Sequence, residues 1–124
     1  SFLFTSPFCH PAIVIRKEVL YKVNNYKVEK ITRRAEDYDL FMRVYANGYK
    51  GYNMQEFLYK FREDKDAFKR RAYKYRLDEV QVRYRGFKAL GLMPKGFLYI
   101  IKPLIVGLIP QIILSKIRRY RKEK

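Results

Sequence analysis

The feature that most limits how this chain can fold is an apolar segment near its C-terminal end. Residues 97–114 contain one charge, Lys102, and two prolines, Pro103 and Pro110. A straight helix over these 18 residues would be about 27 Å long, barely the thickness of a hydrocarbon core, and interior prolines kink or break a helix. The segment therefore predicts two short helices that re-enter at a membrane interface. A membrane-spanning helix and packing against another domain are the alternatives.

Positive charge is concentrated in the same half of the chain. The 124 residues carry 28 Lys and Arg against 12 Asp and Glu, a net charge of +16. Residues 1–62 contribute +5 of this charge, and residues 63–124 contribute +11. A field of one sign attracts polyanions, of which anionic lipid and nucleic acid are the usual candidates. We expect an anionic membrane surface and no nucleic acid, because the sequence has no zinc-finger spacing, RNA-recognition signature or glycine-rich phosphate loop.

Composition narrows the class of protein further. Apolar residues make up 48% of the chain, too many for a disordered basic tail. The single cysteine, Cys9, excludes an internal disulfide and a four-cysteine zinc site, and it favours a reducing compartment. Together with the basic C-terminal half, this predicts a cytoplasmic protein that is peripheral on the inner face of the membrane. The chain starts at Ser1 without the pattern of a signal peptide, so we expect it to belong to a longer chain.

The first 62 residues mix signals for strand and helix. Four apolar residues at 12–15 predict a short buried strand, and Asn24-Asn25 predicts a turn. Helical spacing of apolar residues predicts a helix over residues 37–47, and Gly48 stands where such a helix ends. These signals predict an α+β arrangement for the first part of the chain.

The rest of the chain, residues 63–124, has the pattern of a helical tail. No Gly or Pro interrupts residues 64–85, which predicts a long helix to about residue 90. Five apolar side chains recur along it at helical spacing and predict its packing face: Tyr73, Leu77, Val80, Tyr84 and Phe87. The predicted fold is therefore an α+β part followed by a mainly helical, membrane-associating tail.

Acidic residues gather where the helix at residues 37–47 should begin. Glu36, Asp37 and Asp39 fall in or beside its first turn, where the helix dipole and the free amide groups favour a carboxylate. Such a group can cap the helix, with Asp39 and Arg43 as an i,i+4 pair worth about 0.3 kcal/mol. It can also act as a base. Taken alone, the local pattern favours capping.

The neighbours of the acidic cluster change that interpretation. Five motifs follow one another at residues 7–17 (PFCHPAIVIRK), at Asn24-Asn25-Tyr26, at residues 35–40 (AEDYDL) with Arg43, at Gly48-Tyr49-Lys50 with Asn53, and at residues 58–62 (LYKFR). In this order and spacing they resemble family 2 glycosyltransferases, which are inverting enzymes of the GT-A fold. The family's usual turn is Gly-Gly-Tyr, and Asn tolerates the left-handed conformation that such a turn needs.

The resemblance implies an activity and residue roles. It implies transfer of a sugar from a nucleotide-sugar donor to a hydroxyl of a saccharide or lipid-linked acceptor, with inversion, in bacterial surface polysaccharide or glycolipid synthesis. Asp37 occupies the place of the general base, and Glu36 that of a supporting group. His10 and Arg62 are expected on the acceptor or substrate side. Residues 1–62 would be the C-terminal, acceptor-side half of a Rossmann-like α/β GT-A domain.

The resemblance also implies a donor-binding half and a metal-binding motif that residues 1–62 do not contain. The family's donor-binding half, and the Asp-x-Asp motif that holds a divalent metal (Mg or Mn), lie upstream of the matching region. We assign no metal site to this chain, because Asp37 and Asp39 are two positions apart on a helix and because Asp64 and Asp66 are placed to cap the next one. We therefore expect the chain alone to be inactive and to self-associate through an uncovered strand edge.

A noncatalytic module is the alternative to a transferase. Basic charge interleaved with Tyr73, Tyr75 and Tyr84 can bind phosphates and stack bases, as a nucleic-acid-binding module does. A basic module that binds a membrane surface without catalysis is the other form of this alternative. The apolar segment at residues 97–114 argues against nucleic acid.

Overall fold

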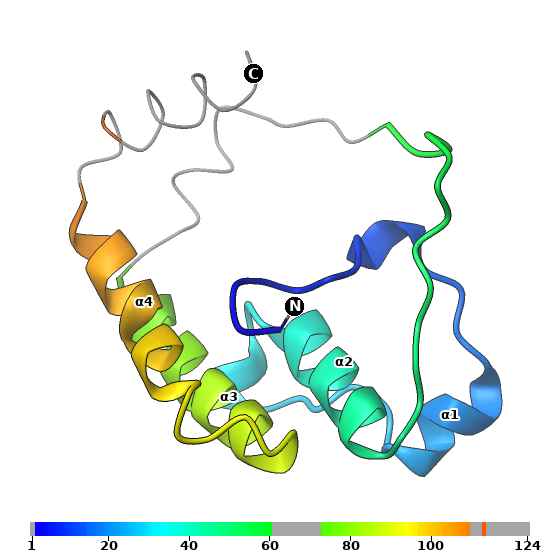
Figure 1. Ribbon diagram of the computed structural model, residues 1–124, viewed down its shortest axis with the longest axis horizontal. Helices are drawn as coiled ribbons and strands as arrows, with labels where there is room; N and C mark the ends of the chain where they lie inside the picture. Colours follow the sequence, from blue (N-terminus) through cyan, green and yellow to red (C-terminus); the bar gives the residue numbers. More distant parts are fainter. Residues whose placement is uncertain (1, 61–72, 110–112, 114–124) are drawn as a thin grey trace.

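The computed structural model describes residues 2–60, 73–109 and 113. Within these residues the chain forms four α-helices and two short 3-10 helices: α1 (Lys17–Lys22), α2 (Glu36–Ala46), α3 (Lys74–Ala89), α4 (Phe97–Leu108), η1 (His10–Ala12) and η2 (Lys30–Thr32). Figure 1 shows α3 and α4 together on one side of α2 and α1 on its other side. The described part of the fold is helical.

The strand predicted at residues 12–15 is wrong, and with it the α+β class for the described residues, in which no sheet is present. Pro11 lies in the first turn of η1, where its fixed φ angle suits a helical conformation. The backbone is extended at Ile13, but an extended segment becomes a strand only when a partner takes up its backbone hydrogen bonds. Ile13 and Ile15 instead pack against the two apolar clusters of the helices, while Val14 is fully exposed.

Helix α2 is the centre of the described fold. The predicted helix is confirmed: acidic residues occupy its first turn, and Gly48 adopts a φ of +83° just past its end. One apolar cluster joins α2 to α3 and α4, and a second joins α2 to α1. The buried residues that α2 contributes are Tyr38, Phe41 and Met42 to the first cluster and Leu40 and Val44 to the second.

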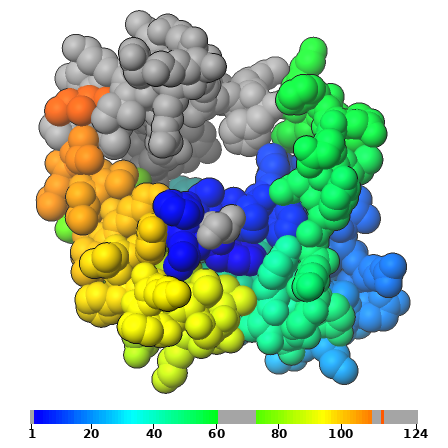
Figure 2. All heavy atoms as spheres, in the orientation of Figure 1, coloured from blue at the N-terminus to red at the C-terminus, as the bar shows by residue number. Residues whose placement is uncertain are grey.

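The N-terminal residues complete the first cluster. Figure 2 shows this segment (blue) lying between α4 (yellow) and the residues that follow α2 (green). Phe2 is 9% exposed, and its ring meets Tyr45 edge-on with the centroids 4.9 Å apart. A segment without helix or strand is therefore held in place by aromatic packing.

Helix α3 packs through only part of its predicted face: Phe87 is buried and Val80 packs against the first cluster. Tyr73, Leu77 and Tyr84 are between 45% and 51% exposed. A Cβ at Gly86 would collide with the side chain of Met42, so this glycine lets α3 lie close against α2. The buried residues of α3 are Asp78, Val82, Arg83, Gly86 and Phe87.

Helix α4 runs through Pro103, so the predicted break at that residue is wrong. Pro103 is buried, and Gly107 lies so close to the ring of Tyr73 that a Cβ there would be 3.1 Å from it. Packing against α3 offsets the backbone hydrogen bond that proline cannot make.

The predicted continuation beyond Pro110 lies outside the described residues, apart from position 113. Among the helices of the described part, none combines the length and the apolar character needed to cross a membrane.

Tyr38 provides a pH-dependent test of this core. Its hydroxyl donates a hydrogen bond to the carbonyl of Phe2, and burial raises its pKa to about 12, although the nearby Arg83 guanidinium acts in the opposite direction. Because the folded pKa lies above the ordinary value of 10.0, this contribution to stability is complete below pH 10.0 and is lost as the pH rises towards about 12. We expect urea unfolding to show wild type losing stability relative to Tyr38→Phe above about pH 10. A difference that stays constant from about pH 8 to about pH 11 would contradict this assignment.

Candidate active site

The acidic pair Glu36-Asp37 forms the beginning of α2, and both side chains are half-buried. The N-cap residue, Ala35, offers no side chain to the free amide groups of the first turn. Asp37 Oδ1 accepts a hydrogen bond of 2.8 Å from the backbone N–H of Tyr38, and the helix dipole favours negative charge at this position. Asp37 is thus a fixed carboxylate that solvent can still reach, as a general base must be.

Glu36 has a free acceptor at the same place. Its Oε2 atom is buried and receives no hydrogen bond from the residues that the structure describes. Buried carboxylate oxygens normally have a donor, so Oε2 is an acceptor whose hydrogen-bonding capacity the described residues leave unused.

His10 and Tyr26 lie next to the acidic turn. Nε2 of His10 and the hydroxyl of Tyr26 are joined by a hydrogen bond of 2.8 Å, and the His10 ring also meets Phe41 of α2 with the centroids 6.3 Å apart. The pKa of Tyr26 is raised, first by burial and then by the negative charges of Asp37 and Glu36. The Tyr26 hydroxyl is therefore within electrostatic reach of both carboxylates. Three separate segments of the chain contribute to this one cluster.

The turn that presents Tyr26 is held by α2. Asn24 and Asn25 adopt φ angles of 58° and 53°, so the left-handed turn predicted there is confirmed. Arg43 donates to the backbone carbonyls of Val23 and Asn25, the second at 2.9 Å. One guanidinium thus fixes the turn and, through it, the position of Tyr26.

Asp39 anchors this arrangement from within the core. It is 2% exposed, and its carboxylate pairs at 2.7 Å with Arg43 on one oxygen and with Arg85 of α3 on the other. Arg85 also donates to Glu29 at 2.8 Å. The predicted i,i+4 pair of Asp39 and Arg43 is present, but it is part of a buried network, where removal of one charge costs far more than the ~0.3 kcal/mol expected for such a pair.

Of the predicted site residues, Glu36 and Asp37 begin α2, and His10 is connected to them through Tyr26, to which it is hydrogen-bonded and whose pKa both carboxylates raise. Arg62 lies outside the described residues. Tyr26 was not predicted as a site residue. The sequence feature that could have indicated it is its position directly after the Asn24-Asn25 turn, within one of the five motifs. In the sequence, Arg85 counted only as one of the positive charges of residues 63–124, because nothing in the neighbouring residues indicates that a buried acid on another helix binds it.

Residues 2–60 and 73–109 contain no group of side chains that could bind a divalent metal. No three His, Cys, Asp or Glu side chains are grouped there closely enough to hold an ion. Asp39 is committed to two arginines and does not converge with Asp37 on a shared site. Asp64 and Asp66 lie outside the described residues.

When the chain is compared with known proteins, the matches are to curated protein sequences. No family model matches the chain, and no solved structure does. The chain is 40% identical over 119 residues to EpsE of Bacillus subtilis (strain 168), which bears a glycosyltransferase name. That alignment covers 96% of this chain and 42% of EpsE.

Two further relatives also have names that describe them as glycosyltransferases. The chain is 35% identical over 107 residues to the UDP-Gal:alpha-D-GlcNAc-diphosphoundecaprenol beta-1,3-galactosyltransferase of Escherichia coli, covering 85% of this chain and 38% of the relative. It is 31% identical over 109 residues to the amylovoran biosynthesis glycosyltransferase AmsE of Erwinia amylovora, covering 85% and 39%. The chain spans about two fifths of the length of these relatives. It is therefore homologous to part of several bacterial proteins that are named as glycosyltransferases.

Proposed function

We propose that residues 1–62 form the acceptor side of an inverting, family 2 glycosyltransferase of the GT-A fold. The observation that supports this most strongly is the cluster at the start of α2, where Asp37 and Glu36 lie beside the hydrogen-bonded pair of His10 and Tyr26. The cluster occurs in a chain of which 96% aligns with a relative that bears a glycosyltransferase name.

The proposed reaction is a single displacement at the anomeric carbon of the donor sugar. A bond forms between the acceptor oxygen and that carbon while the bond from the carbon to the diphosphate oxygen breaks on the opposite face. Asp37 takes the proton of the acceptor hydroxyl, and a base in this position supplies about 10²–10⁴ in rate. The buried Oε2 of Glu36 accepts a hydrogen bond from the bound substrate and orients it.

Donor binding is proposed to lie outside these 124 residues. The relatives extend well beyond the aligned region, and the resemblance puts the nucleotide and any Mg or Mn ion on a different half of the enzyme. No step assigned to the described residues uses a metal. The chain by itself is accordingly proposed to be inactive.

The acceptor is proposed to be a lipid-linked saccharide used in bacterial polysaccharide synthesis. One relative is named for an acceptor attached to diphosphoundecaprenol, and another for biosynthesis of amylovoran. A cytoplasmic location, on the inner face of the membrane, suits both a nucleotide-sugar donor and an acceptor of this kind.

The proposed function is tested by sugar transfer in a full-length enzyme that contains these residues. Labelled nucleotide-sugars, beginning with UDP-galactose, are incubated with the enzyme and a GlcNAc-diphospho-lipid. We expect label to move into the lipid fraction together with release of a nucleoside diphosphate. Folded enzyme that binds a nucleotide-sugar and releases only free sugar, with every saccharide acceptor tried, would contradict the proposal.

Tyr26 gives a prediction specific to the acceptor side. Tyr26→Phe removes the hydroxyl that bonds to His10 and lies near Asp37, while the ring and the turn remain. Loss of one such hydrogen bond is expected to lower kcat/KM for the acceptor by about tenfold. Tyr21→Phe, at an exposed tyrosine of α1, is the matched control and should leave kcat/KM unchanged. Equal values for the two variants would remove Tyr26 from the site.

A further inference from the structure

Helix α4 exposes one continuous apolar face. At 100° per residue, five side chains fall within an arc of about 100° around the helix. All of them are exposed, the most open being Leu98 at 76% and Leu108 at 73%, and the set is Phe97, Leu98, Ile101, Ile105 and Leu108. The opposite side of α4, with Ile100 and Pro103, is buried against the rest of the protein. The helix is thus apolar where it meets water as well as where it meets the core.

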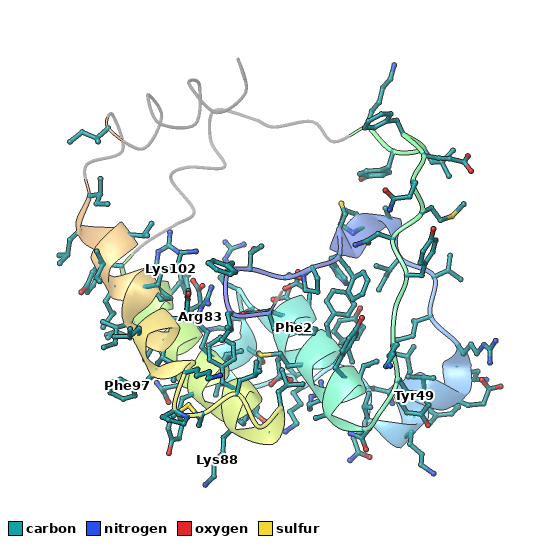
Figure 3. The ribbon with its side chains drawn as sticks, in the orientation of Figure 1. Phe2, Tyr49, Arg83, Lys88, Phe97 and Lys102 are labelled. Carbon is teal, nitrogen blue, oxygen red and sulfur yellow. The ribbon has the colours of Figure 1, made fainter. Side chains whose placement is uncertain are left out.

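The one charge within α4 is turned away from this face. Lys102 donates a hydrogen bond of 3.0 Å to the backbone carbonyl of Phe4, and its ammonium group lies 5.8 Å from the centroid of the Phe4 ring. Figure 3 shows Phe97 pointing outward from α4 and Lys102 pointing in the opposite sense, towards the N-terminal segment. The exposed face therefore carries no charged side chain of its own.

Positive charge predominates in the half of the chain that contains α4. Lys95 is exposed two residues before Phe97, and Lys74 and Lys88 are exposed on helix α3. Residues 63–124 carry a net charge of +11. A second copy of the chain at this face would bring two strongly positive surfaces together, whereas anionic lipid supplies both an apolar phase and the opposite charge.

We propose that α4 is an interfacial membrane anchor that lies in the surface of an anionic bilayer, with its exposed apolar face in the acyl boundary. A helix of 12 residues is about 18 Å long, too short to cross the hydrocarbon core but suited to lie in its surface. The charged side chains around it remain in the headgroup region. This anchoring is independent of the sugar-transfer chemistry, because no residue of the cluster around Asp37 takes part in it.

Sedimentation with vesicles tests the anchor on the 124-residue chain. Phosphatidylcholine vesicles with about 30% phosphatidylserine should bind the chain, and pure phosphatidylcholine or high salt should weaken binding. The double variant Leu98→Glu, Ile105→Glu should lower the partition coefficient by at least about tenfold. The matched control Val14→Glu, Val28→Glu changes two fully exposed apolar residues outside α4 and should stay within about twofold of wild type.

A second measurement does not depend on the stability of the charged variants. The chain has no tryptophan, so a single one reports on its own position. In Leu98→Trp we expect a blue shift on vesicle binding and quenching by brominated lipid, and in Val28→Trp neither change. Equal vesicle binding by both double variants, an unquenched Trp at position 98, or a wild-type dimer that the α4 substitutions dissociate would each overturn the proposal. The dimer result would assign the face to a second copy.

Discussion

In a full-length enzyme that carries this sequence, Asp37→Asn should lower turnover by at least about a hundredfold while the affinity for nucleotide-sugar stays unchanged. Asparagine has nearly the same shape, and its carbonyl oxygen can still accept the hydrogen bond from the backbone of Tyr38, so α2 should begin at the same place. It cannot take up a proton from the acceptor hydroxyl. Turnover at saturating donor and acceptor isolates this loss from changes in binding.

Glu18→Gln is the control for Asp37→Asn. Glu18 is an exposed acid in the first turn of α1, so this variant also removes one carboxylate from the start of a helix, but away from the cluster. Turnover should equal that of wild type. Near-normal turnover in Asp37→Asn would eliminate Asp37 as the base, and equal losses in both variants would indicate a general effect of charge.

Asp39→Asn should destabilise the fold by about 3 kcal/mol, because it leaves two arginines without the charge that they share in the core. Asp39 is 2% exposed, so water cannot replace the lost carboxylate. Arg43 also holds the turn before Tyr26, and the change should therefore loosen the candidate site together with the contact between α2 and α3. Urea unfolding followed by circular dichroism measures the loss.

Glu29→Gln provides the comparison for Asp39, since both acids bind Arg85. The Glu29 side chain is 41% exposed, and pairs of that kind contribute at most about 1 kcal/mol. A loss for Asp39→Asn no larger than the loss for Glu29→Gln would show that the buried network does not stabilise the fold.

The parts of the fold that local chemistry determines could be predicted from the sequence. Acidic residues in a first turn, apolar residues at helical spacing and a glycine beyond the end were enough to locate α2 and its Gly48 terminus. The Asn24-Asn25 turn could be predicted because Asn tolerates positive φ. Asp37 and His10 were found as candidates through the order of motifs, and the structure places them in one cluster with Tyr26.

The parts that depend on distant residues could not be predicted. Apolar residues at helical spacing suggested the packing face of α3, and of these Phe87 and Val80 do pack at the core, whereas Leu77 and Tyr84 are exposed. The close contact of Gly86 with Met42 of α2 could not be foreseen from the spacing. The residues before α1 were expected to form a strand, although nothing in the sequence supplies their partner. Arg85 was recognised only as positive charge, because its contact with Asp39 joins residues far apart in the chain.

The configuration of the transferred sugar is the most direct test of the central claim, that Asp37 activates an acceptor hydroxyl for a single displacement. Proton NMR spectroscopy of the product made by full-length enzyme from a nucleotide-sugar gives this configuration from the coupling of the anomeric proton. The account predicts an anomeric centre opposite to that of the donor. A product with the configuration retained would contradict it, because a single attack on the face opposite the leaving diphosphate must invert the anomeric carbon.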